Sequence, residues 1–514
     1  MSQTAAENPN AARAGAPAAG AKRKLRVGEV VSVNGSHALV MLDEDRPELD
    51  RIHKPQLGAI LAVDTGSCIV LGLVSAMSVP APSLDATGKD LRLIELELIG
   101  EFTKPTPKAP ARFRRGVSTY PTLHDEVQLA AREELAALFA ANGSASVRIG
   151  VVKQDAAIPA TVSVNDLFSR HCAILGTTGA GKSCAITLML LAVLERYKNG
   201  HIVILDPHNE YSHSFGDRAV VFDTSNLTLP YWMLTFDELV EILYPGRVNC
   251  AEEIEILADF IPTAKKMNLS NSASGVKLLA GGRGDGGTVT VDTPLPYRIS
   301  ELLTLIDKTL GSLDNSRTTA PYKRLRARLH GISQDARYNF MFGGLTVQDT
   351  MSDFLGQLFR IPVEGAPISI IELGGLPVEV AQVIVSVVTR LAFEFGLWSH
   401  GAAPLAIIVE DAHRYAPAKE NAGFGPTRKA LVRIAKEGRK VGVSLWVASQ
   451  RPTELDGTIL SQCNTIFAMR LANQADQEAL RAAVPDASTS LLSCLPSLGL
   501  GEAIAVGEGV PLPT

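Results

Sequence analysis

The chain has 514 residues, which corresponds to about three domains at ~150 residues each. Hydrophobic residues make up 46% of the sequence and charged residues 20%, so a wholly disordered or fibrous chain is excluded. The 49 Lys and Arg against 54 Asp and Glu give a net charge of −5, which excludes a surface that attracts nucleic acid everywhere. Any nucleic-acid site must therefore be local.

Residues 1–26 are predicted to be a disordered tail, because Ala, Gly, Pro and Asn dominate them and a short basic cluster follows without an apolar core. The 6 cysteines form no CxxC pair, so neither a zinc ribbon nor a disulfide framework is indicated, and a reducing cytoplasmic location is expected. The longest apolar stretch, Cys184 to Leu194, is far shorter than the ~20 residues that cross a bilayer. No membrane partner is therefore predicted.

Residues 27–100 are predicted to form a small β-barrel. Short β-branched runs alternate with turn residues, and Asn34-Gly35 between two such runs is a strong hairpin signal. Further strands are expected over residues 59–63, 67–75 and 91–98. A barrel of this size can bind a ligand or mediate oligomerisation, and nothing in it indicates catalysis.

After a helix expected over residues 125–141, strands and helices alternate as in a parallel α/β sheet. The strands are expected over residues 173–175, 202–205, 368–373, 406–409, 444–448 and 465–470. We assign residues 101–234 and 356–494 to this α/β core, 235–355 to a mainly helical insertion and 495–514 to a C-terminal strand segment. The glycine-rich stretch 281–287 is predicted to be a flexible loop within the insertion.

The motif G-x-x-x-x-G-K-S spans residues 176–183, between an apolar strand and an apolar helix, which is the context that a phosphate-binding loop requires. Its glycines let backbone N–H groups surround a phosphate, and the helix N-terminus adds the positive end of its dipole. Lys182 is expected to reach the β- and γ-phosphates of ATP, and Ser183 to bind Mg²⁺. The residues expected to contact ATP are Gly176, Thr177, Thr178, Gly179, Ala180, Gly181, Lys182, Ser183 and Cys184.

Two acids, Glu410 and Asp411, follow the apolar strand that ends at residue 409. Glu410 is expected to hold Mg²⁺ together with Ser183, and Asp411 to orient and deprotonate the attacking water. The alternative is a pair of acids at a solvated strand end. Gln450, at the end of the next strand, is expected to report the state of the γ-phosphate through its amide.

Arg439 is not needed by any part of the site in its own chain, so we interpret it as a catalytic arginine inserted into the site of a neighbouring subunit. The alternative is an exposed arginine beside a helix C-terminus. Segments 418–440 and 317–328 are basic and are candidates to line a DNA channel, or alternatively are solvated helix faces. Their few aromatic residues favour duplex DNA over stacking on single-stranded bases.

Several segments together resemble the HerA branch of the HerA/FtsK P-loop ATPases. The similarity covers nearly the whole chain from about Val27, and two positions differ from the usual family pattern: Asp411, where glutamate is usual, and Asn209, where glycine is usual. The segments that carry it are residues 169–183, 206–211, 294–297, 360–362, 410–417, 449–456 and 462–464.

The resemblance implies a fold class and an assembly. It implies a RecA-like P-loop ATPase core with a helical insertion, preceded by a small β-barrel like that of the ATP-synthase catalytic subunits. It also implies a homo-hexameric ring that translocates DNA, a partner nuclease on the ring, and a C-terminal segment packed near the ATP site.

The leading functional hypothesis is a hexameric, ATP-driven DNA translocase or helicase that works with a partner nuclease or effector protein in DNA end processing or antiphage defence. The alternative is an ATP-bound ring scaffold that assembles and activates an antiphage effector with little translocation, and Asp411 keeps this alternative open. A small-molecule kinase is disfavoured, because it explains neither the barrel nor Arg439. The chain itself carries no recognisable nuclease motif.

Overall fold

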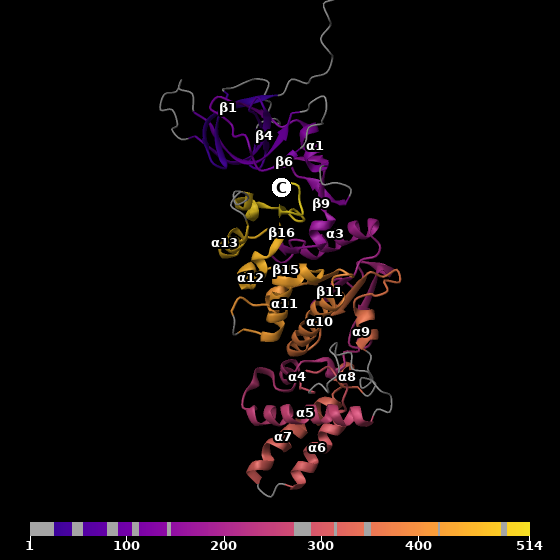
Figure 1. Cartoon of the computed structure of the whole chain (residues 1–514). Coiled ribbons are helices and arrows are strands. Elements are labelled where there is room, and N and C mark those ends of the chain that lie inside the picture. Colours follow the sequence, from indigo (N-terminus) through magenta and orange to yellow (C-terminus); the bar gives the residue numbers. More distant parts are fainter. Residues whose placement is uncertain are drawn as a thin grey trace, which may run out of the picture. The chain divides into compact units, whose positions relative to one another are not determined.

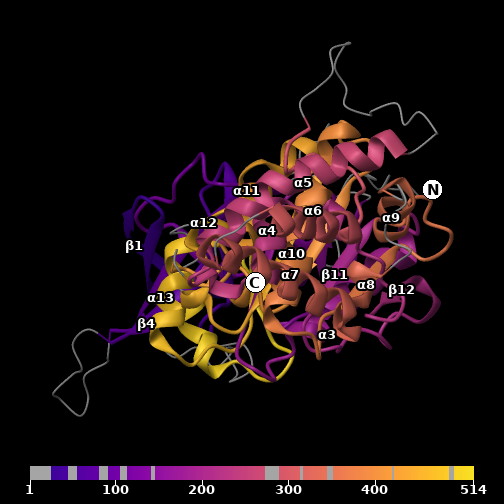
Figure 2. The same ribbon diagram turned by 90° about the horizontal axis from the view of Figure 1, so that it is seen from below.

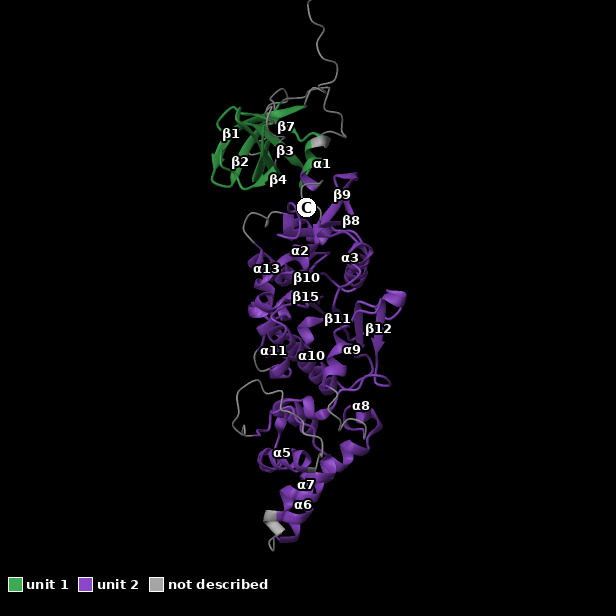
Figure 3. Cartoon of the chain, turned by 45° about the vertical axis from the view of Figure 1, so that its right-hand side comes forward, with its two compact units in different colours: residues 1–137 green, residues 138–514 purple. Residues whose placement is uncertain are grey.

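The computed structural model describes residues 25–43, 55–79, 91–104, 113–140, 145–271, 289–312, 316–343, 351–419, 422–484 and 491–514. Nearly all of the expected N-terminal tail, and the expected glycine-rich loop at residues 281–287, lie outside these described residues. The chain divides into two compact units, Met1–Ala137 and Leu138–Thr514 (Figure 3).

The first unit is a closed antiparallel β-barrel. The strand order β2-β1-β7-β3-β4-β5 closes through pairing of β2 with β5, and β6 adds to β5. The β1–β2 hairpin turns at Gly35, with Asn34 paired with His37, as the Asn-Gly signal predicted. The strands are β1 (Arg26–Asn34), β2 (His37–Leu42), β3 (Ile60–Asp64), β4 (Cys68–Ser78), β5 (Leu93–Thr103), β6 (Phe113–Arg115) and β7 (Glu126–Leu129).

The barrel extends beyond residue 100, because β7 lies between β1 and β3 and pairs with both. The prediction of a helix over residues 125–141 was therefore wrong at its start. Helix α1 (Arg132–Ala140) begins only after residues 126–129 have supplied the hydrogen bonds that close the barrel. Local sequence pattern does not reveal this pairing, since the partner strands lie far away in the chain.

The second unit is built on an eight-stranded sheet in the order β12-β13-β11-β14-β15-β10-β16-β17. Figure 1 labels β11, β15 and β16 of this sheet. Its strands run parallel except β17, which pairs antiparallel with β16. All six strands expected in the core are present, whereas β12 and the hairpin of β8 (Ser146–Val152) and β9 (Asp155–Ser163) were not assigned from sequence. The strands of the sheet are β10 (His171–Leu175), β11 (Ile202–Asp206), β12 (Ala219–Phe222), β13 (Ile368–Glu372), β14 (Leu405–Val409), β15 (Val443–Ser449), β16 (Cys463–Ala468) and β17 (Ile504–Gly507).

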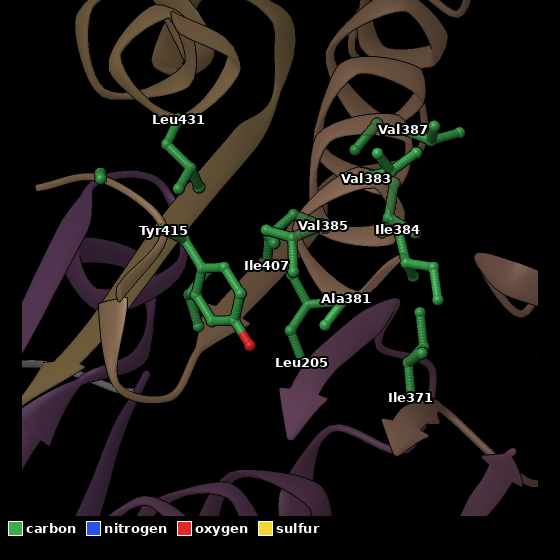
Figure 4. Packing of buried hydrophobic residues seen from close by; sticks show 14 of the residues in the cluster. Leu205, Ile371, Ala381, Val383, Ile384, Val385, Val387, Ile407, Tyr415 and Leu431 are labelled. Atoms are coloured by element: carbon green, nitrogen blue, oxygen red, sulfur yellow. The ribbon is translucent and has the colours of Figure 1, made fainter. Parts of the chain in front are cut away.

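Helices cover both faces of this sheet, so its strands are buried on both sides and read as continuous apolar runs. On one face, α3 (Lys182–Arg196) packs its Ile186 and Leu190 against alternate strand residues. On the other face, α10 (Val378–Trp398) and α11 (Gly425–Glu437) pack against the strand residues of opposite parity, as Figure 4 shows for Leu205 and Ile407. This is the RecA-like α/β architecture that was expected.

Among the described residues, α10 alone is long and apolar enough to cross a membrane, by length and composition. In the fold, 72% of its most apolar window is buried. Its burial between the sheet and its neighbours accounts for its composition.

The described part of the insertion is mainly helical, and Figure 2 shows these helices gathered together. A buried ion pair joins it to the core: the Glu238 carboxylate lies 3.0 Å from the guanidinium of Arg390 in α10 and accepts a hydrogen bond from Ser386. Thr235 and Glu238 form a capping box that starts the first of these helices. The helices are α4 (Phe236–Leu243), α5 (Ala251–Asn271), α6 (Ile299–Ser312), α7 (Ser316–Gln334), α8 (Asn339–Phe342) and α9 (Met351–Leu358).

Three further helices belong to the second unit. They are α2 (Val164–Phe168), α12 (Gly457–Ser461) and α13 (Gln474–Ala483).

Candidate nucleotide-binding site

The loop of residues 176–181 joins the carboxyl end of β10 to the first turn of α3. Gly179 and Gly181 have φ values of +76° and +107°, in the left-handed region that favours glycine. Gly181 is the N-cap of α3, so the unpaired N–H groups of the helix start at this loop. A Cβ atom on Gly176 would lie 2.8 Å from the Cβ of Met469, which explains why glycine is needed there.

Backbone hydrogen bonds hold this loop to three neighbouring segments. The N–H of Gly176 donates to the carbonyl of Ser449 (3.2 Å), and the N–H of Thr177 donates to the carbonyl of Arg470 (2.9 Å). The N–H of Gly501 donates to the carbonyl of Ala180 (3.2 Å), so the C-terminal segment contacts the loop within the same chain. The loop is thus held in shape by residues far away in the sequence.

Lys182 and Ser183 lie at the start of α3 in different surroundings. Lys182 is buried, with 9% of its surface exposed, while Ser183 is half-buried and Cys184 is exposed. The hydroxyl of Ser183 donates to Oε2 of Glu210 at 2.7 Å. Lys182 is close enough to Glu410 for its charge to lower the pKa of that carboxyl.

The acids expected to serve the metal and the water follow β14, at the same sheet edge as the phosphate loop. Glu410 is 3% exposed, and burial raises its pKa to about 7, against the opposing effects of a hydrogen bond from Tyr211 and the charge of Lys182. The Tyr211 hydroxyl donates to Oε2 of Glu410 at 2.6 Å. Asp411 is 6% exposed and has a φ of +50°.

The turn after β11 supplies functional residues that the sequence analysis did not assign. His208 Nε2 lies 2.8 Å from Oδ2 of Asp411, while Glu210 and Tyr211 bond Ser183 and Glu410 as described above. Segment 206–211 was noted only for its resemblance to HerA. The signal was present, since these polar residues directly follow a buried apolar strand and parallel strands present their carboxyl ends at one edge.

Gln450 directly follows β15, which lies between β10 and β14 in the sheet. The hydroxyl of Thr178 donates a hydrogen bond to Oε1 of Gln450, so the structure brings Gln450 to the phosphate loop. A polar cavity of about 380 Å³ opens beside this pair. Its lining residues are Thr177, Thr178, Gln450, Arg451, Thr453, Glu454, Asn473 and Asp476.

Arg439 does not lie beside the phosphate loop of its own chain. It lies in the 3-10 turn Gly438–Val441 before β15, is exposed, and lies near His171, the first residue of β10. The phosphate loop follows the last residue of β10, so Arg439 and Lys182 lie at opposite edges of the sheet. This position agrees with the interpretation that Arg439 has no role in its own site.

Several of the candidate DNA-contacting arginines have partners within the fold. Arg428 pairs with Asp456 at 2.6 Å, and the guanidinium of Arg433 lies 4.1 Å from the ring centroid of Phe393. In the insertion, three arginines of α7 bond to other helices: Arg324 to Glu252 and Glu253, Arg326 to Asp307, and Arg328 to the carbonyl of Leu243. In both segments, therefore, part of the basic charge is already engaged within the fold.

Comparison with known proteins finds similarity over most of the chain. Residues 147–392 match the family model described as "Helicase HerA, central domain". The "DNA double-strand break repair helicase HerA" of Saccharolobus solfataricus is 25% identical over 479 residues, which cover 89% of this chain and 86% of that protein. These matches support membership of the HerA family.

Other proteins similar to this chain show comparable levels of identity. The "Probable helicase MJECL08" of Methanocaldococcus jannaschii is 28% identical over 74% of this chain and 72% of its own length. The "DNA double-strand break repair helicase HerA" of Pyrococcus furiosus is 26% identical over 72% of this chain and 69% of its own length. Among solved structures, VirB4 of Thermoanaerobacter pseudethanolicus aligns with a TM-score of 0.49 and 15% identity, over 71% of this chain and 94% of that chain.

Proposed function

We propose that this HerA-family protein is an ATPase that uses ATP hydrolysis to translocate along or unwind duplex DNA. One observation carries the proposal: the ends of β10, β14 and β15 bring Lys182, Glu410 and Gln450 to one edge of a parallel sheet. The relatives whose names include "helicase" support DNA as the substrate.

ATP with Mg²⁺ is the cofactor that fits this edge. The loop offers N–H donors and the buried Lys182 for the β- and γ-phosphates. Ser183 and Glu410 offer the oxygen ligands that Mg²⁺ prefers, and a bound Mg²⁺ would supply positive charge beside a carboxylate that burial has deprived of water. Asp411 then orients and deprotonates the attacking water, while Gln450 senses the γ-phosphate.

The exposed face of α11 is the proposed DNA contact. Lys429 and Lys436 lie seven residues apart on this face and are exposed, and Lys440 is exposed in the turn that follows the helix. A ring of identical subunits repeats such a stripe around one axis, so a channel can be basic although the chain carries a net charge of −5. The lack of aromatic side chains on this face favours tracking of a duplex backbone.

A homo-hexameric ring is the proposed assembly, with Arg439 of one subunit completing the site of the next. Since Arg439 and the phosphate loop lie at opposite sheet edges, a head-to-tail contact would bring them together, and such contacts form a ring when the rotation between subunits closes. A partner nuclease or effector supplies the DNA cleavage, in end processing or antiphage defence. The rival proposal is a ring scaffold with slow ATP turnover. It rests on the presence of Asp411 where glutamate is usual in the family.

The proposal is tested by ATP turnover with and without duplex DNA. Lys182→Ala is expected to lower turnover by about 100-fold or more, because it removes the buried cation of the phosphate loop. Lys198→Ala is the matched control, since Lys198 is an exposed lysine beyond the end of α3. Turnover of Lys182→Ala within about twofold of wild type would show that this loop is not catalytic.

A further inference from the structure

The turn of residues 206–211 is organised from within by one buried carboxylate. Asp206 is wholly buried at the end of β11 and accepts hydrogen bonds from the backbone N–H of His208 (3.1 Å) and of Tyr211 (2.9 Å). Asn209 has a φ of +57°, and its amide oxygen accepts a hydrogen bond from the N–H of Gly374 (3.0 Å), in the loop after β13. The turn is therefore fixed from both sides.

This fixed turn directs three polar side chains at residues of the ATP site. Glu210 accepts from Ser183, Tyr211 donates to Glu410, and His208 bonds Asp411. The first two contacts involve the expected metal ligands. The third involves the residue to which we assign the attacking water, and no step proposed above uses His208.

Asp411 needs such a partner for two physical reasons. Its side chain is short, and its backbone has a left-handed conformation outside any regular strand or helix. Regular secondary structure therefore does not fix the orientation of its carboxylate. It also neighbours Glu410, whose charge raises the cost of holding a second carboxylate in a buried place. A hydrogen bond from an imidazole to Oδ2 fixes the carboxylate plane and offsets part of that repulsion.

We propose that His208 is a positioning residue for ATP hydrolysis: it holds Oδ2 of Asp411 so that Oδ1 faces the attacking water. The inference rests on the proposed function, in which Asp411 serves the water. His208 is 45% exposed in its side chain while Asp411 is buried, so the imidazole closes the outer side of the carboxylate. Orientation of this kind acts on the chemical step more than on nucleotide binding.

The test compares His208→Ala and His208→Gln with wild type in steady-state ATP hydrolysis. His208→Ala is expected to lower kcat by about 10-fold or more and to change KM for ATP by less than about threefold. His208→Gln keeps an N–H donor at similar reach and is expected to retain kcat within about threefold. His213→Ala, at an exposed histidine of the next turn, is the matched control and is expected to match wild type.

A double-mutant cycle with Asp411→Asn separates a positioning role from a general structural one. If His208 acts through Asp411, His208→Ala costs less than about twofold in single-turnover hydrolysis once Asp411 is replaced. A loss of the same factor in both backgrounds overturns the proposal. A His208→Gln variant as inactive as Asp411→Asn also overturns it, and this holds even where His208→Ala fails to fold.

Failure of the proposed function gives a different result. If Lys182→Ala and Asp411→Asn leave ATP turnover unchanged, the site itself is misassigned. If both abolish turnover while His208→Ala matches His213→Ala, the site stands and the role of His208 is refuted.

Discussion

At the scale of single residues, the ATP site combines buried charges with partners that offset their burial. Glu410 is almost wholly buried, yet the Tyr211 hydroxyl and the charge of Lys182 both favour its ionised form. Burial of an unpaired carboxylate is costly, so these contacts explain how the acid can remain beside the phosphate loop. Asp411 has a partner in His208 in the same way.

Substitution of Asp411 distinguishes the hypothesis of a DNA motor from that of a ring scaffold. Asp411→Asn removes the proposed base and keeps the shape of the side chain, so we expect ATP turnover to fall by about 100-fold while nucleotide binding changes little. Asp411→Glu, which restores the longer side chain usual in the family, is expected to leave turnover intact or raise it. The measurement is DNA-stimulated ATP turnover beside the nuclease or effector activity of the assembled complex. Unchanged DNA degradation with Asp411→Asn would favour the scaffold.

At the scale of secondary-structure elements, His171 joins three of them. It is the first residue of β10, its Nδ1 accepts from the N–H of Leu445 in β15 (3.0 Å), and its ring also bonds the carbonyl of Ala435 in α11. Burial, with a smaller effect from the charge of Arg439, lowers the pKa of His171 to about 4 against the opposing effect of the Ala435 bond. The neutral ring therefore ties β10, the strand before the phosphate loop, to β15 and α11.

This arrangement predicts a pH-dependent stability. The folded-state pKa lies below the unfolded value of about 6.5, so the unfolded chain binds the extra proton between these values and stability falls as the pH falls from 6.5 to 4. The loss attributable to His171 is up to about 3 kcal/mol. Urea unfolding of wild type and His171→Gln across this range measures it. Equal pH slopes for the two proteins would contradict the prediction.

The basic face of α11 predicts a measurable salt dependence. Replacing Lys429 and Lys436 by Ala should weaken duplex DNA binding at all sequences alike and reduce the slope of log affinity against log salt concentration by about 1–2, because fewer counterions are released. Fluorescence anisotropy at several salt concentrations gives this slope. The Lys198→Ala, Lys266→Ala double variant has the same net charge and is the control. An equal loss of DNA affinity in that control would contradict the assignment of α11 as the DNA contact.

At the scale of the whole molecule, function depends on what lies at the opposite edges of the core sheet. The phosphate loop, Glu410 and Gln450 follow carboxyl ends of strands, whereas Arg439 precedes an amino end. One subunit therefore holds an incomplete hydrolytic site if an arginine is needed. The proposed ring completes it.

The proposed ring makes two predictions: the mass of the assembly, and the recovery of ATP turnover when two inactive variants are mixed. Light scattering with ATP is expected to give six subunits, and Arg439→Ala is expected to lower turnover by about 10³ or more. Mixing Arg439→Ala with the separately inactive Lys182→Ala should restore part of the turnover, because some neighbouring pairs then contain one intact loop and one intact arginine. A stable monomer with full activity, or mixtures as inactive as either variant, would argue against an arginine in trans.

The sequence alone was sufficient for the parts of this protein that depend on neighbouring residues. The phosphate loop, the six core strands and the Asn-Gly hairpin follow from glycine positions, apolar runs and turn residues, since φ/ψ preferences and burial patterns act over a few residues. The same holds for placing Glu410 at a strand end.

Only the tertiary structure decided which distant residues meet. It placed β7 in the barrel, paired Arg324 and Arg326 within the insertion, and brought the 206–211 turn to Ser183, Glu410 and Asp411. Strand order determines such contacts, because β11 lies next to β14 although about 200 residues separate them in the chain. The local sequence pattern around His208 does not show that β14 is the neighbour of β11. His208 therefore meets Asp411 only when the sheet forms.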